Sequence, residues 1–148
     1  MISSVPLAAA ILLLVAFGAA LHGVRVLVPK AAESSLHPEG AVFRPGMPRQ
    51  LLLASAYSLS FAASVYVAWI PQVFVARDSV LQTYWSAFLV CETISIVIGG
   101  LVLRRAYRQD SGPRLSLSSA FVGSFVLHVE MAVITFFAAI AFTLRIGG

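Results

Sequence analysis

The sequence predicts an all-α membrane protein in which four transmembrane helices form a single antiparallel bundle. The chain has 148 residues, of which 59% are hydrophobic and only 11% are charged, whereas about a quarter of the residues of a soluble domain are charged. Two uncharged stretches, residues 1–24 and 50–76, exceed the roughly twenty residues that cross a bilayer, and two further apolar stretches of that length carry a single acid each. The basic residues behind the net charge of +4 flank these stretches, which indicates membrane orientation and argues against nucleic acid as a partner.

Residues 5–26 form the first predicted span. A cleaved signal peptide is the alternative, but residues 1–4 carry no positively charged side chain, and a signal peptide normally has one there. We therefore expect an uncleaved helix. Small residues recur in it at the spacing that lets helix backbones approach closely, either within the monomer or at a dimer face: Ala16, Ala19, Ala20 and Gly23.

His22 lies near the predicted end of this helix, and Gly18 precedes it by one turn. A histidine beside such a space is a candidate haem or metal ligand. The alternative, which we favour, is an interfacial histidine hydrated by lipid headgroups. His128 in the fourth span is a second haem candidate, although the two histidines are expected at different depths. The sequence identifies no cofactor or metal beyond these candidates.

Two connections are rich in basic residues. Residues 27–49 contain four prolines, which prevent a long regular helix, and their net charge is positive. His37 and Glu39 in this segment are a weak pair of metal-ligand candidates. Residues 104–114 contain four arginines and one acid. Both connections are therefore predicted to be cytoplasmic, which places the N- and C-termini outside.

The second span, residues 50–76, carries hydroxyl groups along its length. Tyr57, Ser60 and Ser64 recur at helical spacing and share a face. These side chains either bond the carbonyls of their own helix one turn back or line a polar path.

The third span, residues 79–103, begins directly after Arg77 and Asp78, so the second and third helices should form a tight antiparallel hairpin. Glu92 lies at the middle of this span. A charged carboxylate at this depth costs several kcal/mol unless it is paired or hydrated. Glu92 is therefore either a protonated group bonded to a neighbour or a proton or cation site.

The fourth span, residues 115–144, has His128 and Glu130 at its middle. Positions two apart point about 200° apart around a helix, so the two side chains lie on different faces and are not expected to bind one metal. Glu92 and Glu130 lie at similar depths in consecutive helices. We therefore hypothesise that these two acids share one proton.

Several classes of function fit this pattern. We favour an oligomeric proton- or cation-coupled transporter or channel, in which Glu92, Glu130 and His128 are the ion or proton sites and Tyr57, Ser60 and Ser64 line the path. The second class is a non-catalytic subunit of a larger membrane complex, such as a respiratory complex with quinone or haem. The third is a membrane enzyme for a lipid-soluble substrate. The fourth is a structural bundle.

Two further expectations follow. The chain lacks the common nucleotide-binding, metalloprotease and serine-hydrolase motifs, so an enzyme is the less favoured interpretation. Four helices are too few to enclose a large cavity alone. Beside the lipid bilayer, the expected partner is therefore a second copy of the chain or a larger membrane complex.

Overall fold

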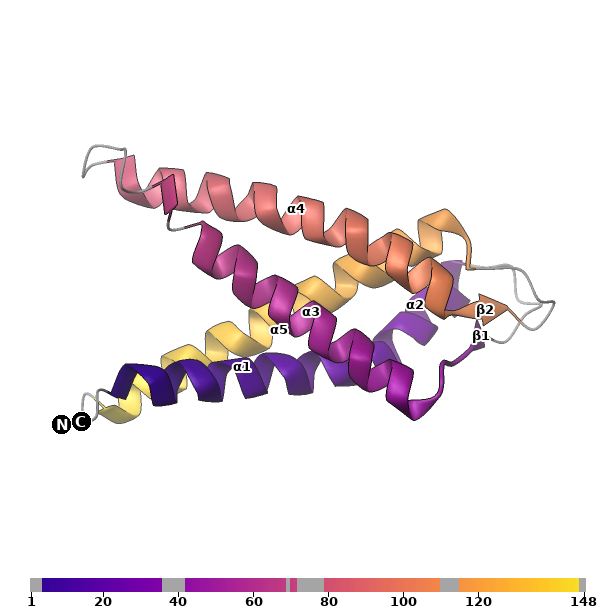
Figure 1. The fold of residues 1–148 in the computed structure, drawn as a ribbon, viewed down its shortest axis with the longest axis horizontal. Helices are drawn as coiled ribbons and strands as arrows, with labels where there is room; N and C mark the ends of the chain where they lie inside the picture. The colour runs from indigo at the N-terminus through magenta and orange to yellow at the C-terminus, as the bar shows by residue number, and fades with distance from the viewer. Residues whose placement is uncertain (1–3, 36–41, 69, 72–78, 110–114, 147–148) are drawn as a thin grey trace.

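The computed structural model is all-helical apart from one short pair of strands (Figure 1). The structure describes residues 4–35, 42–68, 70–71, 79–109 and 115–146. The elements in chain order are α1 (Ser4–His22), the π-helical turn η1 (Gly23–Leu27), α2 (Val28–Ser35), β1 (Val42–Phe43), α3 (Met47–Val67), α4 (Val80–Ala106), β2 (Arg108–Gln109) and α5 (Leu117–Ile146).

Four helical stretches are long and apolar enough to cross a membrane. They are Leu7–Ala31, Met47–Val67, Val80–Ala106 and Leu117–Leu144. The predicted fold class, four transmembrane helices in an antiparallel bundle, is confirmed. The chain is a multi-pass integral membrane protein.

The first helical stretch continues beyond the end predicted near Val26. α1 passes into η1 and then into α2, and the N–H of Val28 bonds the carbonyl of Gly23, five residues back. The next residue is Pro29, whose ring would clash with the carbonyl four residues earlier in a regular α-helix. The wider π turn relieves this clash. The segment 27–49 therefore begins as a helix and not as an irregular connection.

α3 ends at Val67, and not near Ala76 as predicted. Pro71 gives the reason, because a proline ring clashes with the carbonyl four residues back, which is that of Val67. α4 begins at Val80 and packs antiparallel beside α3, as expected for a hairpin (Figure 1). The connection is longer than the predicted Arg77–Asp78 turn, and these two residues lie outside the described part of the chain.

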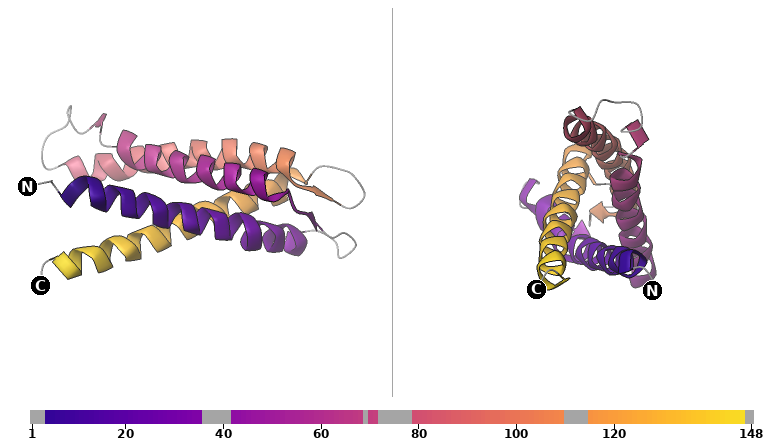
Figure 2. Two further views of the ribbon diagram at one scale, coloured as in Figure 1. Left: turned by 60° about the horizontal axis from the view of Figure 1, so that its bottom comes forward. Right: turned by 90° about the vertical axis from the view of Figure 1, so that its left-hand side faces the viewer.

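The four long helices form a ring: α1 and α4 each pack against both α3 and α5. The helices converge toward the end that carries α2, β1 and β2, and they diverge toward the end that carries both termini (Figures 1 and 2). β1 and β2 pair antiparallel, with Val42 opposite Gln109 and Phe43 opposite Arg108. The two basic connections are thereby joined at the converging end.

The small residues of α1 face the interior of the bundle. Ala16, Ala19, Ala20 and Gly23 are all buried, where α1 packs against α3 and α5. Their spacing therefore serves packing within the monomer. Gly18 differs, because it is exposed and nothing lies within 4 Å of the position of a side chain there.

Candidate functional site

Polar side chains of all four membrane spans lie near the middle of the bundle. Those close to the midpoints of their spans are Tyr57, Glu92, His128 and Glu130. His22 also lies well inside the first span, Leu7–Ala31. The helix continues through η1 and α2, so His22 is not at its end, and the interfacial position favoured from the sequence stays a prediction.

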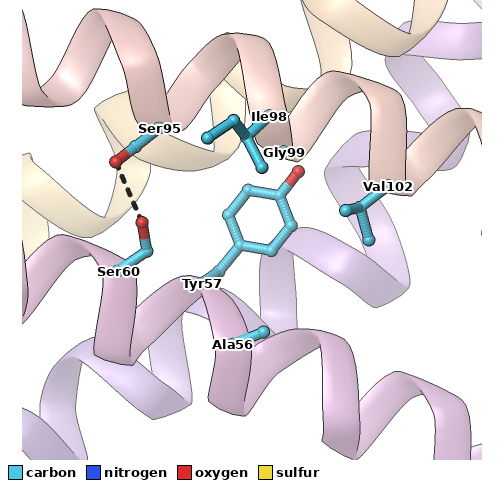
Figure 3. A pocket seen from close by; sticks show the side chains of 7 residues that line it. All are labelled: Ala56, Tyr57, Ser60, Ser95, Ile98, Gly99 and Val102. Atoms are coloured by element: carbon cyan, nitrogen blue, oxygen red, sulfur yellow. Dashed lines mark hydrogen bonds between the residues drawn. The ribbon is translucent and has the colours of Figure 1, made fainter.

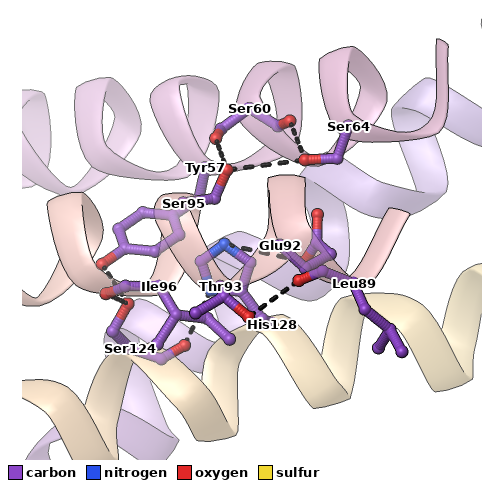
Figure 4. A network of polar contacts seen from close by, with 10 residues as sticks. All are labelled: Tyr57, Ser60, Ser64, Leu89, Glu92, Thr93, Ser95, Ile96, Ser124 and His128. Carbon is purple, nitrogen blue, oxygen red and sulfur yellow. Dashed lines mark hydrogen bonds and ion pairs between the residues drawn. The ribbon is translucent and has the colours of Figure 1, made fainter. Parts of the chain in front are cut away.

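His128 of α5 and Glu92 of α4 form a buried pair (Figure 4). His128 is 3% exposed and Glu92 is 8% exposed. The Nδ1 atom of His128 lies 2.8 Å from the carbonyl oxygen of Ser124, one turn earlier in α5. Because a carbonyl oxygen can only accept, Nδ1 must carry the proton and donate it. The other ring nitrogen, Nε2, is left to face Glu92.

The pair is not bridged by a hydrogen bond. Nε2 of His128 lies 4.0 Å from Oε2 of Glu92, which is too far for one. Nε2 and the second carboxylate oxygen, Oε1, are buried without a hydrogen-bond partner. An imidazole lone pair and a carboxylate are both acceptors, so they cannot bond each other. One added proton would make Nε2 a donor to the carboxylate, so the pair is arranged to take up one proton.

Tyr57 of α3 closes one side of this pair. Its ring meets the His128 ring edge-on with centroids 5.2 Å apart, and its hydroxyl donates to Ser124 Oγ at 3.2 Å. Ser124 in turn donates to the carbonyl of Ile96 in α4 at 2.9 Å. Gly99 makes room for this junction, since a Cβ there would lie 2.5 Å from the Tyr57 hydroxyl. One polar junction therefore joins α3, α4 and α5.

Three serines extend the polar contacts from Glu92 into the seam between α3 and α4 (Figure 4). Ser64 faces the Glu92 carboxyl across this seam. Ser95 lies 3.4 Å from Ser64 and accepts from Ser60 at 2.9 Å, while Ser64 also donates to the Ser60 carbonyl at 3.1 Å. A pocket of about 90 Å³ beside Tyr57, Ser60 and Ser95 (Figure 3) has room for water.

A second acid–base pair joins α1 to α5. Nδ1 of His22 lies 2.6 Å from Oε1 of Glu130. The Glu130 side chain is 11% exposed, whereas the His22 side chain is 56% exposed. Gly23 leaves space for the carboxylate, because a Cβ there would lie 2.7 Å from Oε2 of Glu130. The carboxylate is thus enclosed, while much of the imidazole remains on the outer surface of α1.

Each carboxylate has its own histidine partner. Glu92 meets His128 and Glu130 meets His22. Among the contacts of the described residues, no hydrogen bond or ion pair joins the two acids, so no contact supports a directly shared proton. The two histidines are likewise held by different carboxylates and do not meet at one cofactor. His128 and Glu130 lie on different faces of α5, as the helical spacing predicts.

An apolar cavity of about 570 Å³ lies between the diverging parts of the helices. Residues from all four helices line it, and its aromatic lining consists of Phe61, Tyr84, Trp85, Phe88 and Phe136. Sequence reasoning missed this cavity. The one signal in the sequence is the placement of Trp85, Phe88 and Glu92 on a single face of the third span, since residues seven and four positions before Glu92 share its face.

Within the described part of the chain, no group of three or more His, Cys, Asp or Glu residues is placed to hold a metal ion. The weak pair His37 and Glu39 lies outside that part. Comparisons of the chain with protein-family models, with curated proteins and with solved structures find no match. The functional argument therefore starts from the geometry of the two histidine–glutamate pairs and the cavity.

Proposed function

We propose that this chain is a membrane transport protein that conducts protons, and that its proton site is the His128–Glu92 pair. The observation that carries the proposal is the unbridged geometry of the pair: two buried acceptors 4.0 Å apart at mid-depth. An ionisable group at this depth needs either a partner or a functional reason. A proton that binds to the pair gives each group a hydrogen-bond partner, and its later release gives the burial of these groups a functional reason.

Two routes lead away from the pair. On the side of α3, the hydroxyls of Ser64, Ser95 and Ser60 form a chain of groups that can each donate and accept a proton. On the side of the termini, the cavity begins one turn from the pair, since its lining includes Phe88, four residues before Glu92. Access from two directions is what proton conduction across the bundle requires. The second pair, Glu130 with His22, is a further candidate proton site.

The proposal includes an orientation and an oligomeric state. The end with the basic connections is cytoplasmic and the termini are outside, because positive residues remain on the cytoplasmic side. More than one copy, or a larger membrane complex, covers the face of α1 that carries His22. The support for this is that 56% of the His22 side chain is exposed within the first candidate span, Leu7–Ala31, where an uncovered polar group is costly.

The test is proton flux through the purified protein in liposomes that contain a pH-sensitive dye. The wild-type chain should dissipate an imposed pH gradient when potassium and valinomycin compensate the charge movement. Glu92→Gln should reduce the flux to that of empty liposomes, because an amide cannot take up a proton. Ser95→Ala should slow the flux without abolishing it.

Thr93→Val is the matched control for Glu92→Gln. Thr93 is the next residue on α4, is exposed, and its hydroxyl only bonds the Leu89 carbonyl of its own helix, at 2.7 Å. This variant should conduct like the wild type. Wild-type flux in Glu92→Gln, or no flux in the wild-type protein, would contradict the proposal.

A second candidate is a haem-bearing subunit of a larger membrane complex, and the His22–Glu130 contact favours it. Histidines that ligate a metal usually donate their other ring N–H to a carboxylate or carbonyl, and His22 meets Glu130 in this way at 2.6 Å. Gly18 leaves free space one turn earlier. A Soret band in the purified protein that is lost in His22→Ala would favour this candidate, and its absence would count against it.

A further inference from the structure

The cavity between the diverging helices has the features of a ligand site. Its volume of about 570 Å³ lies within the usual range for small-molecule pockets, and its lining is mostly apolar, as such pockets are. A neighbouring pocket of about 240 Å³ shares Leu12, Phe61 and Val65 with it. Trp85 and Phe136 in the lining are 52% and 61% exposed. A lipid-soluble ligand can therefore enter from the bilayer.

An aromatic cluster forms one wall of this cavity. Phe88 stacks on Tyr84 with ring centroids 6.3 Å apart and planes at 11°. It also meets Trp85 and Phe61 edge-on, at centroid distances of 5.9 and 6.3 Å. Phe136 lines the cavity from α5. The faces of aromatic rings are electron-rich and attract cations, so this wall suits an aromatic cation better than an anion.

An acidic residue, Glu92, lies one helical turn beyond the lining of the cavity. Glu92 shares a face of α4 with Trp85 and Phe88 and lies one turn deeper than Phe88. On α5, His128 shares a face with Thr135, which lines the cavity. Oε1 of Glu92 and the hydroxyl of Thr135 are buried without hydrogen-bond partners. The described lining contains no lysine or arginine, so no fixed positive charge competes for the carboxylate.

We propose that the cavity binds a lipophilic aromatic cation, which pairs with the Glu92 carboxylate and displaces the proton of the His128–Glu92 pair. This inference rests on the proposed function and names its substrate class. The Glu92 carboxylate has one negative charge and pairs with one positive charge at a time. The proton and the ligand therefore compete for it. The groups that face Glu92 are His128 from α5 and Ser64 from α3, and the ring of Tyr57 from α3 meets that of His128. The described lining from α1 is entirely apolar.

The test uses two ions of the same shape and opposite charge: tetraphenylphosphonium and tetraphenylborate. Binding of each radiolabelled ion to the purified full-length chain is measured by equilibrium dialysis in detergent. The cation should bind saturably and the anion should not. Affinity for the cation should fall at least about tenfold from mildly alkaline to mildly acidic buffer, because a proton then occupies Glu92.

Variants locate the binding site. Glu92→Gln should weaken cation binding at least about tenfold and remove its pH dependence. Glu92→Asp, which keeps the charge, should retain part of the affinity and the pH dependence, and so separates a lost charge from a misfolded protein. Phe88→Leu should weaken binding about three- to thirtyfold through loss of a cation–π contact. Thr93→Val should bind like the wild type.

Equal binding of the two ions, or cation binding that is unchanged in Glu92→Gln, would overturn the inference, because either result indicates simple partition into an apolar space. The outcome is separable from that of the flux experiment. Proton flux that depends on Glu92 without cation binding overturns the ligand assignment alone. Cation binding that depends on Glu92 without proton flux overturns the transport proposal and leaves the binding site in place.

Discussion

At the scale of single residues, the hydroxyl of Tyr107 supplies a hydrogen bond that the distorted first helix cannot make by itself. Tyr107, directly after α4, is fully buried, and its hydroxyl donates to the carbonyl of Val24 in η1. The N–H of Val28 bonds Gly23 and not Val24, and Pro29, next in the π register, has no N–H to offer. The Val24 carbonyl therefore depends on Tyr107 for its hydrogen-bond partner, so a side chain that follows the third span satisfies a backbone group of the first.

Tyr107→Phe should lower the free energy of unfolding by about 1–3 kcal/mol, because it leaves the buried Val24 carbonyl without a partner. Thermal and denaturant unfolding in detergent measure the change. Tyr66→Phe is the control, since Tyr66 is 75% exposed, and its stability should match that of the wild type. Equal stability of the two variants would show that the Tyr107 hydroxyl contributes nothing.

The same contact should depend on pH in the alkaline range. Burial raises the pKa of Tyr107, with Arg44 opposing the shift. The unfolded chain therefore releases this proton first, above about pH 10. The stabilisation is fully present below that pH and is lost as the pH rises further. The stability difference between the wild type and Tyr107→Phe should accordingly narrow above about pH 10, and a constant difference would contradict this assignment.

At the scale of the helices, two glycines let α4 approach α3 and α5 at the same time. Gly99 and Gly100 are both buried. A Cβ at Gly99 would lie 2.5 Å from the Tyr57 hydroxyl and 2.7 Å from Ser124 Oγ, and one at Gly100 would lie 2.5 Å from the Phe121 ring. The polar junction at the centre of the bundle therefore exists only because α4 has no side chains at these positions.

Gly99→Ala should destabilise the protein by about 1–3 kcal/mol through overpacking and should separate the Tyr57 and Ser124 hydroxyls. Thermal unfolding in detergent measures the stability. Gly18→Ala is the matched control, because a Cβ at Gly18 meets nothing within 4 Å. It should leave the stability unchanged or raise it slightly, since alanine favours helix. A neutral Gly99→Ala would contradict the observed packing.

At the scale of the whole molecule, the bundle is narrow at the end of the basic connections and wide at the end of the termini (Figures 1 and 2). The β1–β2 pairing joins the connections at the narrow end. The cavity lies between the diverging parts, and the His128–Glu92 pair lies one helical turn beyond two of its lining residues, Phe88 and Ala132. A ligand that enters from the bilayer on the wide side therefore reaches the His128–Glu92 pair before it meets the closely packed half.

The proposed orientation predicts which ends of the helices are accessible from outside the cell. In a Cys91→Ser background, Thr143→Cys places a thiol at the wide end of α5 and Ser118→Cys places one at its opposite end, both at exposed positions. A membrane-impermeant maleimide should label Thr143→Cys in intact cells and should label Ser118→Cys only after the cells are opened. The reverse pattern would place the basic connections outside.

The sequence alone determined the number and approximate position of the spans, because bilayer thickness converts directly into the length of an apolar run. It also identified the acids at mid-depth and the separation of His128 from Glu130, which follow from depth and helical period. The ends of helices were predicted less well, since a π turn accommodates Pro29 whereas Pro71 ends α3.

Only the tertiary structure decided which side chains meet. A sequence gives the face on which Glu92 or His22 lies, but not the helix that packs against that face. Three features are therefore properties of the assembled bundle: the pairing of Glu92 with His128, the pairing of Glu130 with His22, and the aromatic cavity whose lining comes within one helical turn of Glu92.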